Sequence, residues 1–325
     1  MISRVADNCF WMGRYLERTE STSRVLSSTR TLALDAELSA RQCWLPVLIV
    51  AGEEPSFLQR FGPAAADDGE KVEHTMTWDE EWSSLMRSAA AARENARSIR
   101  ELISLEVWEA TNELHLWLQS SAARAEYDEH RYGFYQRVRS ATQLVVAQIQ
   151  STMLHDTALD FAWLGVMLER AGWTARVLDV HHHALATAGA GDSEVETALW
   201  IAILRTCSGF EPFLRRSRGQ LSGRAAASFL LLDRAFPRSV RYCVASAQRR
   251  LAAIRPPQET HLPGGRSLAR VSALDEWLSR LDSSAVEGET FHEVLTRVVD
   301  ETAGVCAELS EELLGAPAPA APPNR

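Results

Sequence analysis

The chain has 325 residues, of which 46% are apolar and 24% are charged, and its formal net charge is −9. This balance is typical of a folded globular protein and excludes fibrous and wholly disordered classes, while the length allows one large domain or two medium ones. Because a nucleic-acid binder needs a basic surface that displaces counterions from phosphates, the acidic charge argues against a nucleic-acid partner.

The cysteines are odd in number and scattered, and no two of them form a C-x-x-C pair. This spacing favours reduced thiols and a cytoplasmic location over a disulfide framework or a zinc site. The first residues, MISRVADNCFWMGR, lack the basic start, apolar core and cleavage site of a secretory signal, and no window approaches about 18 uninterrupted apolar residues. We therefore expect neither export nor membrane insertion. The cysteines are Cys9, Cys43, Cys207, Cys243 and Cys306.

In chain order, the first expected element is a helix that includes residues 13–26, GRYLERTESTSRVL. Residues 43–52, CWLPVLIVAG, favour either a short strand or a short buried helix, and Pro46 weakens the case for a strand. The next segment, residues 52–70, contains glycine, proline and acidic residues and is expected to be a loop.

Long helices are expected after this loop, because no proline lies between Pro63 and Pro212 and apolar residues recur at spacings of three and four. Further loops are expected at residues 187–193, where Asp192 and Ser193 are candidate helix caps, and at residues 255–267. The tail, GAPAPAAPPNR at residues 315–325, should be disordered. The pattern predicts an all-α domain over residues 1–314, a multi-helix bundle of roughly ten to thirteen helices.

An internal repeat appears when the chain is shifted by 152 residues. ADNCFWMGRYLERTESTSRVL, residues 6–26, then aligns with ALDFAWLGVMLERAGWTARVL, residues 158–178, and ten of the twenty-one positions are identical. A weaker correspondence relates ARSIRE at residues 96–101 to PRSVRY at residues 237–242. These matches predict two related helical halves, at about residues 1–150 and 151–314, and a shared cavity between them.

The repeated segment carries charges that an exposed helix face does not explain. Gly13, Glu17 and Arg24 share one stripe of a helix, and polar and apolar positions alternate around the rest of its circumference. The pattern is typical of a helix buried on most sides, where an unpaired charge costs several kcal/mol. The charges should then either lock two helices together or line a ligand pocket, and the glycines should allow another backbone to come close.

Several segments together resemble the alpha-E family of bacterial all-helical proteins. These are MGRYLERTESTSRVL, RENARSIRELISLEVWEATN, LGVMLERAGWTARVLD, LRTCSGFEPF and FLLLDRAFPRSVRYC. The family occurs beside circularly permuted ATP-grasp proteins, often with a transglutaminase-like protein. The resemblance implies the helical partner of a peptide or amide ligase that activates a carboxylate with ATP. Its pattern falls on Gly13, Arg14, Glu17, Arg18, Arg24, Arg97, Arg100, Glu106, Trp108, Gly165, Glu169, Arg170, Arg176, Arg205, Ser208, Glu211, Pro237 and Arg238.

The second copy of the motif departs from the family pattern. Val166 and Met167 stand where the first copy has Arg14 and Tyr15, so the second half lacks one cation.

Other residues offer weaker chemistry. His155, beside Asp156, is a candidate general base, with a capping or hydrogen-bonded interior histidine as the alternative. Three consecutive histidines at 181–183 point about a hundred degrees apart on a helix and cannot chelate one metal ion. Cys207 and Ser208 lie close to Glu211 but lack a partner base in sequence reach, which makes a nucleophile the weaker interpretation.

Three functions remain open at this point. The first is the helical partner of an ATP-grasp peptide or amide ligase, non-catalytic alone or a subunit of that ligase, which binds a substrate carboxylate or peptide through the buried Arg/Glu constellation. The second is an enzyme that uses Glu17 and Glu169 as paired acid and base. The third is a purely structural bundle whose charges only specify helix register. No glycine-rich phosphate loop is present, and we expect no metal and no cofactor. The candidate catalytic residues are Glu17, Glu169 and His155. The candidate substrate-binding residues are Arg14, Arg18, Arg24, Arg170, Arg176, Arg97, Arg100, Arg205, Glu211 and Arg238.

Overall fold

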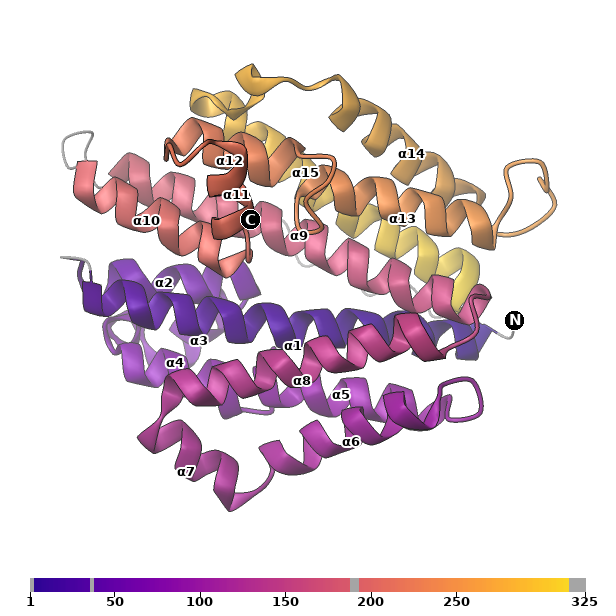
Figure 1. Cartoon of the computed structure of the whole chain (residues 1–325), viewed down its shortest axis with the longest axis horizontal. Coiled ribbons are helices and arrows are strands. Elements are labelled where there is room, and N and C mark those ends of the chain that lie inside the picture. The colour runs from indigo at the N-terminus through magenta and orange to yellow at the C-terminus, as the bar shows by residue number, and fades with distance from the viewer. Residues whose placement is uncertain (1–2, 36–37, 188–192, 316–325) are drawn as a thin grey trace.

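The computed structural model describes residues 3–35, 38–187 and 193–315, and within these ranges it contains fifteen α-helices and no β-strand (Figure 1). The predicted all-α multi-helix bundle is therefore confirmed. The helices outnumber the roughly ten to thirteen expected from a mean helix length, because α3, α7 and α11 have only eight, nine and seven residues.

The first nine helices end near residue 187. They are α1 (Ser3–Asp35), α2 (Ala40–Ala51), α3 (Glu54–Phe61), α4 (Gly69–Trp78), α5 (Leu85–Ser98), α6 (Leu105–Leu118), α7 (Ser121–Glu129), α8 (Arg131–Thr152) and α9 (Thr157–Thr187), with a 3-10 turn, η1 (Pro63–Asp67), before α4. The remaining elements are α10 (Ser193–Thr206), α11 (Phe210–Arg216), α12 (Gly223–Leu232), α13 (Val240–Ile254), α14 (Gly265–Arg280), η2 (Ser283–Val286), α15 (Gly288–Leu309) and the π-helical turn η3 (Ser310–Leu314).

The two longest helices form the centre of the bundle. α1 has 33 residues and α9 has 31, and they pack along each other. In Figure 1, α3–α8 lie below α1, while α9–α15 lie above it. α5 and α8 pack against α1, and α13 and α15 pack against α9. The N-terminal and C-terminal groups of helices therefore meet chiefly through α1 and α9, the helices that carry the repeated segment.

Serine residues start many of the shorter helices. In each case the side-chain oxygen accepts a hydrogen bond from a backbone N–H in the first turn, which satisfies a donor that the helix itself leaves free. The capping serines are Ser39, Ser84, Ser104, Ser120, Ser222 and Ser239, at the starts of α2, α5, α6, α7, α12 and α13.

The segment at residues 43–52 is helical. α2 contains Pro46 in its interior and buries Trp44, Val47 and Leu48, and a capping box formed by Ser39 and Gln42 starts it. The strand alternative is therefore wrong, because the helix is held by burial and capping in spite of the proline.

The loop expected at residues 52–70 is also wrong in part, because it contains α3 and η1. Pro55 lies in the first turn of α3, where its fixed φ angle and missing N–H are tolerated. Phe57 is completely buried and contacts the rings of Phe61 and Trp82, so burial of this aromatic residue stabilises the short helix.

Apart from Ala66, the buried apolar side chains of the described residues form one continuous cluster. No helix in the described ranges combines the length and apolarity needed to cross a bilayer. Gly315 is the only described residue of the tail expected at 315–325, and the candidate cap Asp192 lies outside the described residues. Ser193 is the first residue of α10.

Candidate functional site

The backbones of α1 and α9 touch where they cross. A Cβ atom added to Gly13 would lie 2.0 Å from the carbonyl oxygen of Ala162, and one added to Gly165 would lie 2.1 Å from that of Phe10. Residues 10 and 13 correspond to residues 162 and 165 under the shift of 152, so the two contacts are reciprocal. The close approach expected from the two glycines is confirmed.

The two Glu-Arg motifs exchange partners across this crossing. Glu17 of α1 accepts a hydrogen bond from Nη2 of Arg170 at 2.6 Å, and Glu169 of α9 accepts one from Nε of Arg18 at 2.7 Å. Glu17 and Glu169 are 0% and 1% exposed. The charges of the repeated segment are therefore inside the protein, and they fix the register of α1 against α9.

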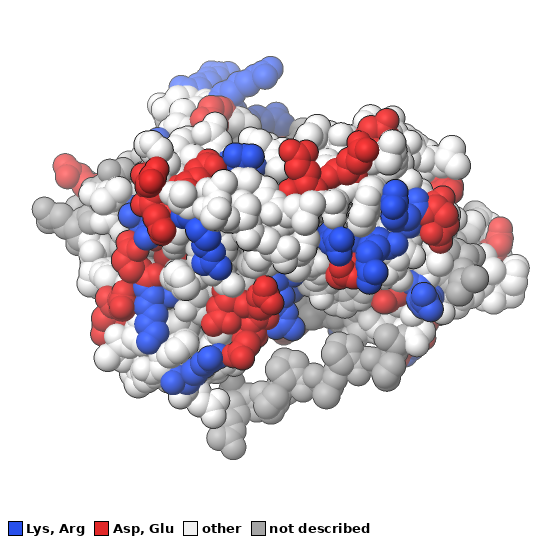
Figure 2. All heavy atoms as spheres, turned by 90° about the horizontal axis from the view of Figure 1, so that it is seen from below, with Lys and Arg blue, Asp and Glu red and all other residues white. Residues whose placement is uncertain are grey.

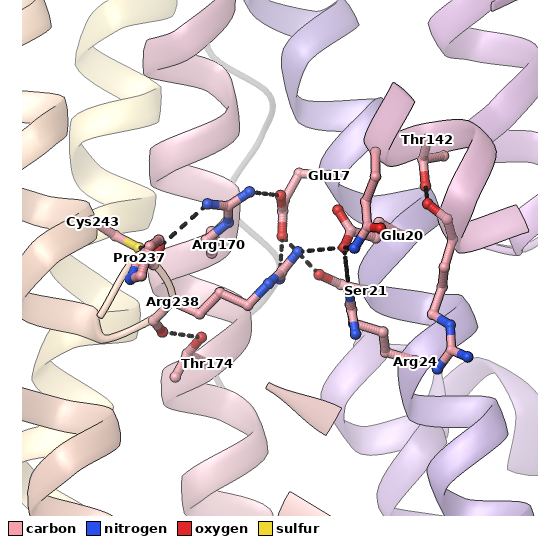
Figure 3. A network of polar contacts seen from close by, with 12 residues as sticks. Glu17, Glu20, Ser21, Arg24, Thr142, Arg170, Thr174, Pro237, Arg238 and Cys243 are labelled. Carbon is pink, nitrogen blue, oxygen red and sulfur yellow. Dashed lines mark hydrogen bonds and ion pairs between the residues drawn. The ribbon is translucent and has the colours of Figure 1, made fainter. Parts of the chain in front are cut away.

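Glu17 also receives a cation from the segment before α13. Nη1 of Arg238 donates to Oε1 of Glu17 at 2.7 Å, and Ser21 Oγ lies 3.0 Å from the same oxygen (Figure 3). Arg170 donates in addition to the carbonyl oxygen of Pro237 at 3.2 Å. Glu17 thus joins α1, α9 and the start of α13.

Glu20 extends this network toward α8, and the sequence reasoning missed it. Its Oε1 accepts from Arg24 at 2.7 Å, from Arg238 at 2.7 Å and from the side-chain amide of Gln143 at 3.0 Å. Burial alone would raise the pKa of Glu20, but Arg238, Arg24 and Arg170 lower it to about 2. The spacing of four between Glu20 and Arg24 on one helix was the available sequence signal.

Glu169 lies in a second cluster formed by α1, α9 and α15. Nε of Arg14 donates to it at 2.7 Å, beside the bond from Arg18, and Nη1 of Arg14 lies 3.2 Å from Sγ of Cys306. Burial opposes ionisation, yet the guanidinium groups of Arg14, Arg18 and Arg176 hold the pKa of Glu169 well below its usual range. A buried and ionised carboxylate with two arginine partners is suited to a structural role and poorly suited to proton transfer.

A polar cavity with a volume of about 790 Å³ lies beside this network. Helices α1, α8 and α10 and the start of α11 line it. Of the predicted substrate-binding residues, Arg24, Arg205 and Glu211 meet here, and Arg139 of α8 joins them without having been predicted. The other polar side chains of the wall are Ser27, Ser28, Thr31, Tyr132, Gln136, Ser140, Gln143 and Ser208.

Two of the cavity's arginines are unpaired. Within the described ranges, neither Arg139 nor Arg205 has a carboxylate within ion-pair distance, whereas Arg24 is held by Glu20. Arg205 is exposed and lies 5.3 Å from the ring centroid of Phe210. Because Glu20 compensates Arg24, the cavity wall carries two unpaired guanidinium groups against the single carboxylate of Glu211, which favours an anionic ligand.

Ser208 adds an unsatisfied polar group to this wall. Its φ angle is 54°, a left-handed conformation that is costly for a residue other than glycine, and its buried Oγ has no hydrogen-bond partner among the described residues. The neighbouring Cys207 is buried, and burial raises the pKa of its thiol to about 11, which disfavours it as a nucleophile. Of the two, Ser208 is the residue that lines the cavity.

The remaining candidates lie away from the cavity. Arg97 is exposed and pairs with Glu94, and Arg100 lies 4.8 Å from the ring centroid of Trp108. His155 is exposed, with Nε2 2.9 Å from the carbonyl oxygen of Gln150.

The histidine run at 181–183 lies at the end of α9. His181 caps a backbone carbonyl of its own helix, that of Val177, and the side chains at 182 and 183 are outside the described set. No group of three or more His, Cys, Asp or Glu side chains in the described ranges could hold a metal ion. On the face drawn in Figure 2, acidic and basic side chains of the described residues are interspersed.

Comparison with known proteins identifies one family. The Alpha-E family, described as a predicted alpha-helical domain with a conserved ER motif, matches residues 1–314. The chain is 25% identical over 330 aligned residues to uncharacterized proteins of Mycobacterium bovis and Mycobacterium tuberculosis, and the alignment covers 96% of this chain and 35% of each relative. The chain thus spans about a third of the length of these relatives. No solved structure matches it.

Proposed function

The chain belongs to the Alpha-E family, and we propose that it binds a carboxylate-bearing peptide in the cavity between α1, α8 and α10 as the helical partner of an ATP-grasp peptide or amide ligase. The observation that carries the binding proposal is the presence of Arg139 and Arg205 on the cavity wall without a carboxylate partner in the described chain. Each guanidinium presents a planar fork of donors that matches a carboxylate.

The rest of the wall fits a peptide better than a simple anion. Gln136, Gln143 and the serine hydroxyls can donate to and accept from amide groups, and Glu211 can accept from an amine. The unsatisfied Oγ of Ser208 gains a partner when a peptide carbonyl reaches it. A volume of about 790 Å³ lies in the range of ordinary ligand pockets.

The ligase partner rests on the resemblance to the family. The sequence has no glycine-rich phosphate loop, so the ATP-dependent step is assigned to the ATP-grasp protein and the recognition of a substrate carboxylate to this chain. A transglutaminase-like protein is a further candidate partner on the same ground.

The Glu-Arg motifs have a structural role in this proposal. Glu17 and Glu169 are buried, and each already accepts hydrogen bonds from two arginines. This geometry favours locking of α1 against α9 over paired acid and base catalysis. Through Glu20, Arg24 and Arg238, the same network orients one wall of the cavity.

Calorimetric titration with a tripeptide tests the binding proposal. The expected result is that a peptide with a free C-terminal carboxylate binds at least about tenfold more tightly than its C-terminal amide, since a charge-assisted pair is lost. Arg139→Gln and Arg205→Gln should each remove that preference, while Arg97→Gln, on an exposed arginine outside the cavity, should keep it. Equal binding of acid and amide contradicts the proposal.

The partner proposal needs a separate experiment. The chain is co-purified with the ATP-grasp protein, and ADP release is measured with and without it in the presence of substrate. We expect release to depend on this chain and to fall with Arg205→Gln. A ligase that turns over equally well alone rules out the role of required partner and leaves the peptide-binding result standing.

A further inference from the structure

The two copies of the repeated segment differ at one charged position. In the first copy, Arg24 donates from Nε and Nη2 to Glu20, four residues before it on α1. Arg176 is the counterpart of Arg24 under the shift of 152, but Gly172 stands where the first copy has Glu20. The second copy therefore keeps the arginine and lacks its intrahelical carboxylate.

Arg176 has no ion-pair partner in the described chain, although it interacts electrostatically with Glu169 and lies 5.8 Å from the ring centroid of Trp173. Its Nε is buried without a hydrogen-bond partner, and no carboxylate of the described residues lies within ion-pair distance of its guanidinium. A buried and unsatisfied donor of this kind costs free energy unless a ligand or water bonds it. The position is thus incomplete in the protein alone.

The surroundings of Arg176 are cationic. Arg14 and Arg18 approach from α1 and donate to Glu169, which lies two turns before Arg176 on α9. A Cβ atom on Gly172 would lie 3.9 Å from Nη1 of Arg176 and 3.4 Å from Oγ1 of Thr302 on α15. Cys306, one turn after Thr302, contacts Arg14, so α1, α9 and α15 meet at this point.

Positive charge exceeds negative charge at this junction. Arg14, Arg18 and Arg176 surround the single carboxylate of Glu169, which leaves two positive charges uncompensated. Burial lowers the pKa of Arg176. The positive charges of Arg18 and Arg14 lower this pKa further, and the carboxylate of Glu169 acts in the opposite direction. The side chains of Arg14 and Arg18 are 16% and 22% exposed, so the junction opens to solvent.

We propose that Arg14, Arg18 and Arg176 form a binding site for a phosphate group at the junction of α1, α9 and α15, separate from the cavity lined by Arg139 and Arg205. A phosphate monoester or inorganic phosphate carries about two negative charges near neutral pH, which matches the uncompensated charge, whereas a carboxylate supplies one. Guanidinium groups bind phosphate oxygens in bidentate pairs. Arg176 supplies the Nε donor that has no partner, while Nε of Arg14 and Nε of Arg18 already donate to Glu169.

Titration with inorganic phosphate, with acetate at matched ionic strength as the monoanion control, tests the site by calorimetry and by thermal unfolding. With Arg205→Gln as the background, which weakens anion binding in the separate cavity, phosphate should bind and raise the unfolding midpoint, and acetate should not. Arg176→Gln should weaken phosphate binding about tenfold or more. Arg97→Gln, on an exposed arginine outside both sites, should leave it unchanged. A second calorimetric titration, with methyl phosphate, measures whether the site binds a phosphate ester as well as the free ion.

Gly172 offers a second test that does not remove an arginine. Gly172→Glu supplies the carboxylate that Glu20 provides in the first copy. The Cβ atom added at residue 172 would lie at ordinary contact distances, 3.4 Å from Oγ1 of Thr302 and 3.9 Å from Nη1 of Arg176. This variant should lose phosphate binding and be more stable than Gly172→Gln, which adds the same bulk without charge and should still bind phosphate. The proposal is overturned if phosphate fails to bind, if Arg176→Gln binds it as the natural protein does, or if the two Gly172 variants bind it equally.

Discussion

The crossing of α1 and α9 provides the sharpest test of the structure, through the substitution Gly13→Ala. The added Cβ would lie 2.0 Å from the carbonyl oxygen of Ala162, whereas ordinary contacts begin at 3.4 Å. Because the obstacle is backbone on a packed helix and not a flexible side chain, the two helices must separate by about the difference between these distances.

This separation acts on the ion pairs beside the crossing. The bond from Arg170 to Glu17 is 2.6 Å long and that from Arg18 to Glu169 is 2.7 Å, so both stretch beyond hydrogen-bond length if the helices part by more than 1 Å. Overpacking costs about 1–3 kcal/mol, and weakening buried ion pairs adds to it. We expect Gly13→Ala to lower the free energy of unfolding by about 2–4 kcal/mol, a large share of the 5–15 kcal/mol that is usual for a domain.

Urea unfolding followed by far-UV circular dichroism measures this loss. Gly133→Ala, in α8, is the matched control. Its Cβ would meet only side-chain atoms of Glu126 and His130, at 3.5 Å and 3.8 Å, and the substitution should raise stability by about 0.5–1 kcal/mol. Gly165→Ala should cost as much as Gly13→Ala, and the double variant should cost less than the sum, because helices already apart accept the second Cβ. A Gly13→Ala protein as stable as the Gly133→Ala protein refutes this account of the crossing.

Three further outcomes follow from the buried charges and thiols. Glu17→Gln leaves Arg170 without a carboxylate and Arg238 with Glu20 alone, and it should lower the free energy of unfolding by about 3–5 kcal/mol in urea, whereas a loss below about 1 kcal/mol contradicts the pairing. The pKa of Glu20 is depressed from 4.5 to about 2, so the contribution of its carboxylate to stability is complete above about pH 4.5 and is lost as the pH falls through 2. Glu20→Gln should therefore reduce the dependence of the unfolding free energy on pH in that window, and an unchanged dependence contradicts the role of Glu20. Burial raises the thiol pKa of Cys207 to about 11 and the thiol pKa values of Cys9 and Cys243 to about 12. These thiols should therefore react with a disulfide reagent at about pH 8 only after denaturation. Rapid labelling of the native protein contradicts their burial.

Asymmetry between the two copies of the motif divides their roles. Both copies supply a glutamate and an arginine to the crossing, and these residues are engaged with each other. Only the first copy has Glu20, which pairs with Arg24 of the cavity wall and with Arg238. The second copy has Gly172 in place of that glutamate, and Nε of Arg176 has no hydrogen-bond partner among the described residues. The crossing of α1 and α9 is therefore locked, the cavity uses the unpaired arginines of α8 and α10, and the proposed phosphate site uses Arg176 of α9.

The sequence by itself determined the helical class, the repeated segment and the close approach of its glycines, because these depend on the spacing of residues along one helix. It also identified Arg205 and Glu211 as candidates without indicating that they meet Arg24. The sequence could not decide which arginine pairs with which glutamate, nor bring in Arg139, since these partners lie on helices more than a hundred residues apart along the chain. Only the packing of α1 against α9 and of α8 and α10 against α1 decides those contacts, because helix periodicity sets which face is buried and leaves open what that face meets.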